Sequence, residues 1–214
     1  MPDIDLAQVF IAFAVLLFSL TIHEAAHAWT ADRLGDSTAR LRGRVSLNPL
    51  VHADPIGTIV FPLVAIISNA PLIGWAKPVP VNIRQLGHPR RDYVLVAAAG
   101  PASNLVIAFA AAVLLSAMSI APQELDRANF SAPIATMLSR AERLNVLLAV
   151  FNMIPIPPLD GGNVIGGLLP KPLALRFDSL IRPYGFILLY ALMLTRGLDY
   201  LIGRPSSLLL SWLQ

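Results

Sequence analysis

Residues 9–29, VFIAFAVLLFSLTIHEAAHAW, carry no charged side chain before His23 and then place three ionisable residues within five positions. A run of about 20 mostly apolar residues is long enough to cross a bilayer as a helix. Ionisable residues inside such a run are costly and usually mark a functional site. The stretch therefore predicts a membrane helix over residues 6–29 with chemistry near its second end.

The composition of the 214-residue chain indicates a multi-spanning membrane protein. Apolar residues make up 56% and charged residues 14%, against about 45–50% and about 25% in soluble domains. The mean hydropathy is +0.65. The chain has no cysteine, which excludes disulfides and thiolate metal ligands. Asp3 and Asp5, without a basic residue, argue against a cleaved signal peptide.

The basic residues indicate contact with a membrane surface. They give a pI near 9.7 but are scattered between apolar runs. We therefore expect them to meet lipid headgroups and set the topology, and we expect no nucleic-acid partner.

Three further stretches are candidate membrane spans. Residues 93–120 form the clearest one, and residues 134–154 are mixed because charged residues lie in the first half. Their strongly apolar part is too short to cross alone, so we expect an extended stretch over residues 155–160 to complete the crossing. Residues 180–202 are the third candidate, weakened by Arg182, Arg196 and Asp199.

Residues 56–75 fit either a full span or a re-entrant hairpin, because glycines and prolines interrupt an apolar run. Basic residues flank this segment on both sides. If the segment crossed the membrane, one basic cluster would lie outside the cytoplasm, against the usual distribution of Lys and Arg. We therefore expect a re-entrant hairpin with both flanks cytoplasmic.

Residues 39–52, ARLRGRVSLNPLVH, alternate partly and end near an Asn-Pro pair, which predicts one or two short strands. The predicted fold is an all-α polytopic membrane protein with about four to six transmembrane helices, a short membrane-edge β-strand or hairpin and a re-entrant segment. We expect residues 1–214 to form a single domain in a cell membrane, with a prokaryotic plasma membrane favoured.

The His-Glu-x-x-His motif predicts a zinc site. His23 and His27 lie four residues apart, so a helix places both imidazoles on one face. Glu24 lies beside the first ligand, where it reaches a water on the metal rather than the metal itself. Zinc lowers the pKa of that water, and Glu24 then takes its proton. A short motif of this kind also arises by chance, and paired buried histidines can be purely structural.

A catalytic zinc site needs a third protein ligand, and Asp160 is the best candidate. It follows three prolines and precedes two glycines in FNMIPIPPLDGG, residues 151–162. Broken backbone at membrane depth is tolerated where it lines a wet cavity. His52 could approach the site but is better explained as a solvated or strand-capping residue, and His88 reads as a surface residue. The alternative for Asp160 is a helix-ending turn at the interface.

With these residues identified, the sequence resembles the site-2 proteases, a family of intramembrane zinc metalloproteases. The resemblance covers about residues 15–170 and is closest to the small prokaryotic branch without PDZ or CBS domains. The matching motifs occur in the expected order: HEAAHAWTADRLGD (23–36), GRVSLNPLVHADPIGT (43–58), AAAGPASNL (97–105) and FNMIPIPPLDGG (151–162).

The resemblance implies one zinc ion per chain, held by His23, His27 and Asp160, with Glu24 as general base. It adds Asn152 as a residue that assists catalysis or binds substrate near the zinc; satisfying backbone freed by the prolines is the alternative. It also adds Asn104 as a substrate-binding candidate, although Asn104 is equally explained as a helix-packing residue. It further implies that the predicted strand pairs with an unwound substrate.

The expected activity is therefore zinc-dependent cleavage of peptide bonds in or near the transmembrane helices of single-span membrane proteins. In this family such cleavage often follows a first cut outside the membrane, in regulated intramembrane proteolysis. Two other functions stay open: a non-catalytic scaffold, or pseudoprotease, and a metal transporter. A transporter has no use for Glu24 as a base. The sequence does not identify the substrate. It is also compatible with a homo-oligomer.

Overall fold

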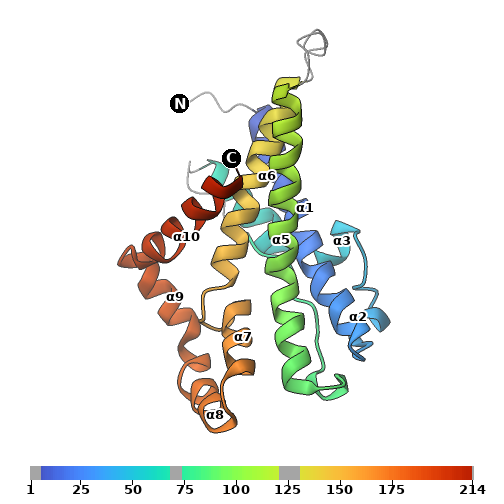
Figure 1. The fold of residues 1–214 in the computed structure, drawn as a ribbon, viewed down its shortest axis with the longest axis vertical. Helices are drawn as coiled ribbons and strands as arrows, with labels where there is room; N and C mark the ends of the chain where they lie inside the picture. The colour runs from blue at the N-terminus through green and yellow to red at the C-terminus, as the bar shows by residue number, and fades with distance from the viewer. Residues whose placement is uncertain (1–5, 68–73, 121–130, 214) are drawn as a thin grey trace.

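Three long helices form the centre of the molecule: α1 (Leu6–Arg33), α5 (Pro89–Ile120) and α6 (Ser131–Asn152). The computed structural model describes residues 6–67, 74–120 and 131–213. Helix α5 packs against both α1 and α6, and the three stand side by side in Figure 1. Two buried apolar clusters lie along α1, one around Leu16 and Leu20 and one around Ala31. They bracket the turn of α1 that carries His23 and His27.

The predicted helices at residues 6–29 and 93–120 are confirmed as α1 and α5, and both are longer than expected. Helix α1 ends just before Gly35, whose φ of 109° favours glycine. Helix α5 begins at Pro89, a residue whose fixed φ suits the first helical position. Within α1, the buried hydroxyls of Ser19 and Thr21 donate to carbonyls one turn back, each at 2.7 Å. Their polar atoms are thus satisfied inside the helix.

Three helical stretches of the described residues are long and apolar enough to cross a membrane: Ala7–Arg33, Pro89–Met118 and Lys171–Leu194. The sequence predicted about four to six. Helix α6 has 22 residues, but Arg140, Glu142 and Arg143 lower its hydropathy. The chain is therefore a helical membrane protein, with fewer such helices in its described part than we expected.

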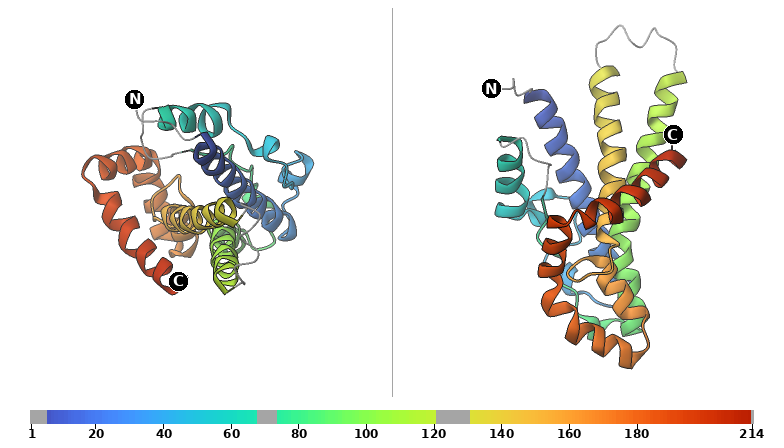
Figure 2. Two further views of the ribbon diagram at one scale, coloured as in Figure 1. Left: turned by 90° about the horizontal axis from the view of Figure 1, so that it is seen from above. Right: turned by 90° about the vertical axis from the view of Figure 1, so that its left-hand side faces the viewer.

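The candidate span predicted over residues 180–202 is displaced along the chain: the long apolar helical stretch that the structure describes runs over Lys171–Leu194, and a break at Arg196 follows it. Helix α8 (Lys171–Leu180) leads through a short turn, η4 (Arg182–Tyr184), into α9 (Gly185–Leu194). Arg196 then adopts a φ of 56°, and α10 (Gly197–Leu213) starts in a new direction. Figures 1 and 2 show α8, α9 and α10 following an arc on the side of the molecule away from α2 and α3.

The strands predicted within residues 39–52 are also wrong, and no strand occurs among the described residues. The segment instead forms two short helices, α2 (Thr38–Leu41) and α3 (Pro49–His52). A strand needs a partner strand that forms hydrogen bonds with its backbone groups. Here side chains form those hydrogen bonds instead. Arg44 donates to the carbonyl of Val51, and Asn48 caps α3 through the Leu50 N–H at 3.0 Å.

The two ends of the segment 56–75 lie against each other. The chain continues through η1 (Pro55–Val60) into α4 (Phe61–Ile67). The Trp75 N–H then donates to the Gly57 carbonyl at 3.1 Å, and the Thr58 hydroxyl donates to the Trp75 carbonyl at 2.8 Å. A Cβ at Gly57 would overlap the Trp75 indole, so only glycine allows this approach. The two described ends of the segment are therefore adjacent, as a hairpin would require; residues 68–73 lie outside the described part.

The link between α6 and α7 (Asp160–Leu168) is a tight turn rather than the extended stretch expected for residues 155–160. The Ile156 N–H donates to the Ile154 carbonyl at 2.7 Å, and the Leu159 N–H donates to the Ile156 carbonyl at 3.0 Å. A Cβ at Gly161 would overlap the Met153 carbonyl. The glycine therefore lets α7 fold back against the turn, which places Asp160 beside α1.

Candidate metal centre

Helix α1 and the start of α7 bring three candidate metal ligands together: His23, His27 and Asp160. The two Nε2 atoms of the histidines lie 3.1 Å apart. Oδ2 of Asp160 lies 3.1 Å from Nε2 of His23 and 3.4 Å from Nε2 of His27. Both histidines are buried. Residues more than 130 positions apart in the sequence thus present one ligand atom each to the same point.

The other nitrogen of each imidazole is already engaged. Nδ1 of His27 lies 2.7 Å from the Val96 carbonyl of α5. A carbonyl only accepts, so this Nδ1 carries the proton and Nε2 presents a lone pair. Nδ1 of His23 lies 2.5 Å from Oδ1 of Asn104, also on α5. Metal-binding histidines usually donate their second ring N–H in this way.

This geometry fits a metal ion. Oδ2 of Asp160 is buried and accepts no hydrogen bond from the residues that the structure describes. With each Nδ1 engaged by α5, the three remaining ligand atoms face one another, an arrangement of lone pairs that a cation would stabilise. Zinc with ligands at about 2.0–2.2 Å in a tetrahedron sets ligand atoms about 3.3 Å apart. The observed separations of 3.1, 3.1 and 3.4 Å agree with this value.

Gly100 gives the imidazoles the room they need. A Cβ on this residue of α5 would lie 2.6 Å from Nε2 of His23 and would overlap Nε2 of His27. Helix α5 can approach α1 at this level only because the position has no side chain. The glycine of AAAGP therefore belongs to the site, although it supplies no ligand atom.

A cavity of about 290 Å³ opens beside the three ligands. Glu24, the residue that follows His23 on α1, lines this cavity. One carboxylate oxygen of Glu24, Oε2, accepts a hydrogen bond from the Val79 N–H at 3.0 Å. The walls come from four parts of the chain; besides the ligands and Glu24 they comprise Pro78, Val79, Val81, Tyr93, Val96, Ala97, Asn152, Pro158 and Asn163.

The structure places the two candidate asparagines differently. Asn152 lines the cavity, and its amide donates to the Leu148 carbonyl at 3.0 Å. This position suits a residue that meets substrate near the ligands, and the bond also satisfies a backbone carbonyl. Asn104 is fully buried and does not line the cavity. The expectation that Asn104 contacts substrate therefore finds no support, because both ends of its amide bond to protein groups.

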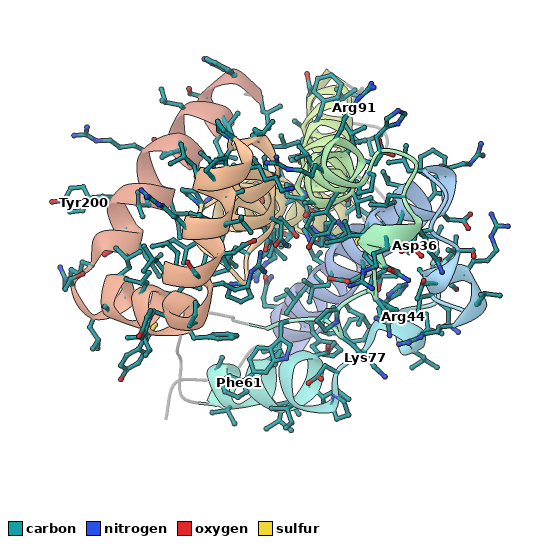
Figure 3. All side chains as sticks on the ribbon, turned by 90° about the horizontal axis from the view of Figure 1, so that it is seen from below. Asp36, Arg44, Phe61, Lys77, Arg91 and Tyr200 are labelled. Carbon is teal, nitrogen blue, oxygen red and sulfur yellow. The ribbon has the colours of Figure 1, made fainter. Side chains whose placement is uncertain are left out.

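Arg44 supports the cavity wall formed by residues 77–81. Its buried guanidinium donates to the carbonyls of Val51, Lys77 and Pro78. Burial lowers the pKa of Arg44 below its ordinary value, and the nearby negative charge of Glu24 offsets this only in part. Figure 3 shows Arg44 and Lys77 on the same side of the molecule, whereas Tyr200 points outward on the opposite side. Arg44 thus fixes the segment whose Val79 N–H holds Glu24.

His52 and His88 lie outside the cluster of ligands. His52 is buried rather than solvated as we expected, and its Nε2 bonds to the Ser46 carbonyl at 2.8 Å. Burial lowers the pKa of His52 below its ordinary value. His88 is exposed, as predicted, and lies 3.9 Å from Asp92.

Sequence reasoning missed Asn145 and Ser19, which lie behind the ligands. Both are fully buried, and the Asn145 amide donates to the Ser19 hydroxyl at 2.8 Å. The signal available in the sequence was a single polar residue in each of two apolar runs, LNVLLAV and VLLFSL. Such residues are costly in a membrane helix unless they have partners.

Comparison with known proteins also indicates a metalloprotease. The sequence profile described as peptidase family M50 matches residues 116–192, which include Asp160. The "Putative zinc metalloprotease YwhC" of Bacillus subtilis is 39% identical over 199 residues, covering 90% of this chain and 87% of that protein. No solved structure matches the chain at a significant level.

Two mycobacterial proteins are also similar. The "Putative zinc metalloprotease Rip2" of Mycolicibacterium smegmatis is 34% identical over 185 residues, which cover 86% of this chain and 66% of that protein. The protein of the same name from Mycobacterium tuberculosis is 34% identical over 157 residues, 72% of this chain and 56% of that protein. The chain therefore spans little more than half to two thirds of these longer relatives.

Proposed function

Because this chain belongs to peptidase family M50, the site-2 protease family of metalloproteases, we propose that it is a zinc-dependent endopeptidase that acts on other membrane proteins. The observation that carries the proposal is the group of three facing ligand atoms with Glu24 on the same cavity. The printed names of the relatives describe zinc metalloproteases and agree with this donor set.

His23, His27 and Asp160 would hold one zinc ion. When bound, zinc supplies Lewis acidity that makes a water nucleophilic near neutral pH. Glu24 would take a proton from the attacking water and later deliver it to the leaving amine. The Val79 N–H holds Oε2 of Glu24, which leaves Oε1 for the proton. Asn152 lines the cavity, and in this proposal its amide orients the substrate carbonyl.

The position of the site supports substrates that lie in the membrane. His23 and His27 lie within Ala7–Arg33, one of the stretches long and apolar enough to cross a bilayer. A transmembrane helix that reaches the cavity must unwind locally, because its peptide bonds are otherwise protected by helical hydrogen bonds. Single-span membrane proteins are therefore the proposed substrates, cleaved near the end of the helix bundle that carries the basic loops.

We place the protein in the cell membrane as a multi-pass protein with one protease domain. The adjacent ends of the segment 56–75 support a re-entrant hairpin, with the basic residues on both flanks in the cytoplasm. The hairpin leads directly into residues 77–81, which line the cavity. The re-entrant segment would thus help to carry one wall of the site into the bilayer.

The test compares wild type with Glu24→Gln, both purified in detergent. We expect both to bind one zinc ion per chain, because Glu24 is not a ligand, and only wild type to cleave a model transmembrane substrate. Glutamine keeps the size of the side chain and its bond with the Val79 N–H but cannot take a proton. Activity should fall by about 100-fold or more, in the range ascribed to a general base.

The outcomes separate the competing functions. A scaffold or a metal transporter would keep its function in Glu24→Gln, and wild type would show no cleavage. Absence of zinc from wild type, or full activity of Glu24→Gln, would contradict the protease proposal.

A further inference from the structure

A chain of buried polar side chains connects the metal site to the third long helix. It runs from His23 on α1 to Asn104 on α5, then to Asn145 on α6, and returns to Ser19 on α1. Asn104, Asn145 and Ser19 are each 0% exposed. Fully buried amides between apolar helices are costly unless every polar atom has a partner. These residues therefore need a role that offsets their cost.

The donor-to-acceptor direction of these hydrogen bonds is fixed at the end farthest from His23. The Asn145 amide lies 2.8 Å from the backbone carbonyl of Ala141. A carbonyl has no proton, so the Asn145 atom facing it must be the NH₂ group. The same NH₂ group donates its second proton to the Ser19 hydroxyl at 2.8 Å, which itself donates to the Val15 carbonyl at 2.7 Å. The Asn145 amide therefore has one orientation.

That orientation passes along the chain to the metal ligand. Because NH₂ of Asn145 faces Ala141, its Oδ1 faces Asn104 and must receive a proton. Asn104 donates that proton through Nδ2 at 2.7 Å, so the oxygen of Asn104 faces His23. This oxygen lies 2.5 Å from Nδ1 of His23 and can only accept. Nδ1 therefore carries the proton, and Nε2 turns a lone pair toward His27 and Asp160.

We infer that Asn145 is a positioning residue that, through Asn104, fixes the tautomer and the ring orientation of His23 as a metal ligand. The inference rests on the proposed function and gives a role to a residue that touches neither the cavity nor the ligands directly. His27 needs no such chain, since the backbone carbonyl of Val96 orients it. The two histidines are thus oriented differently. A backbone carbonyl orients His27, whereas hydrogen-bonded side chains from three helices orient His23.

The test measures metal binding rather than activity. The full chain is purified as wild type, Asn145→Leu and Val146→Ala, and zinc affinity is determined by competition with a chelator. Cobalt is then substituted, and its visible absorption reports the geometry of the ligands. Val146 is the neighbouring residue of α6 and is equally buried, so Val146→Ala controls for lost packing.

We expect Asn145→Leu to weaken zinc binding about 10-fold or more, within the range known for partners of metal ligands, and to change the cobalt spectrum. Val146→Ala should keep both properties of wild type. Asn145→Asp retains an oxygen that faces Asn104 and should recover most of the lost affinity.

Wild-type affinity and spectrum in Asn145→Leu would overturn the inference while leaving the proposed function intact. Absence of zinc and cobalt binding in wild type would instead overturn the proposed function, and the inference with it. If Asn145→Leu does not fold, two other variants provide the test. The inference requires a near-normal cobalt spectrum in Asn145→Asp. It requires an altered cobalt spectrum in Asn104→Leu. Equal spectra in both would contradict it.

Discussion

Gly100 shows how a single missing side chain makes room for a metal site. Its neighbours are the two imidazoles, which a Cβ would meet at 2.6 Å or less. Intrinsic helix propensity favours alanine over glycine by about 1 kcal/mol and so predicts that Gly100→Ala stabilises α5. Contact of the added Cβ with the imidazoles predicts the opposite. Contact with two buried rings outweighs propensity here, because neither ring can move away without losing its bond to α5.

We therefore expect Gly100→Ala to lose most of its bound zinc while retaining its helical circular dichroism. The added methyl group displaces both Nε2 atoms from the positions that face Asp160. The measurement is zinc content per chain after purification. Gly203 of α10 is a matched control, since a Cβ there would have no neighbour within 4 Å. Gly203→Ala should bind zinc as wild type does; equal zinc content in Gly100→Ala would contradict the argument.

The segment of residues 77–81 has no regular secondary structure, and Arg44 is one of the groups that hold it, beside the hydrogen bond from the Lys77 N–H to the His52 carbonyl at 2.8 Å. The guanidinium satisfies carbonyls on both sides of the gap between this segment and residues 44–52. A buried carbonyl that loses its donor costs about 1–3 kcal/mol. The segment also supplies the N–H that holds Glu24. Loss of Arg44 should thus affect stability and catalysis together.

Arg44→Met should expose the amides of residues 77–81 to faster hydrogen exchange and lower the cleavage rate, with zinc content unchanged. Methionine fills the space but donates no hydrogen bond, so the segment moves and Glu24 loses its fixed orientation. Arg42 lies two residues away and is exposed, and Arg42→Met provides the control. Unchanged exchange at Val79 in Arg44→Met would show that other contacts hold the segment.

Some elements were predictable from the sequence and others were not, for physical reasons. The helices at residues 6–33 and 89–120 follow from long apolar runs, since a membrane segment must satisfy its backbone internally. The segment 39–52 was misjudged because its alternation mimics a strand, while Arg44 supplies hydrogen bonds that no pattern reveals. The break at Arg196 depends on a single residue with positive φ.

The candidate site divides in the same way. His23 and His27 follow from helical spacing, Glu24 follows from its place beside the first ligand, and Asp160 follows from the need for a third ligand beside a broken helix. Asn104 was singled out, but its partner could not be known, because a contact between α1 and α5 joins residues 81 positions apart. Asn145 was not singled out at all, since a lone asparagine in an apolar run gives no spacing to recognise.

At the scale of the whole molecule, a metal ion would join the two ends of the fold. His23 and His27 lie on the first helix, whereas Asp160 begins a short helix in the last third of the chain. A ligand that binds only the folded state stabilises it by about 2.7 kcal/mol when present at 100 times its dissociation constant. Zinc should therefore act as a cross-link between α1 and α7.

We expect the melting temperature of wild type in detergent to rise with free zinc and to fall after chelation. Asp160→Asn should show little dependence on zinc, because an amide oxygen is a weak ligand and carries no charge. Differential scanning fluorimetry over a zinc titration makes the comparison. Parallel curves for the two proteins would show that Asp160 does not hold the metal.

Helix α9 has a consequence for handling the protein. It is attached closely at Gly185, where a Cβ would overlap the Pro157 carbonyl, yet in the 18-residue apolar window of Lys171–Leu194 only 6% of the residues are buried within the molecule. In a bilayer, acyl chains would cover this exposed surface, and the surrounding lipid would then act as a structural component of the fold. Detergent choice and nanodisc composition become experimental variables of the same rank as mutation.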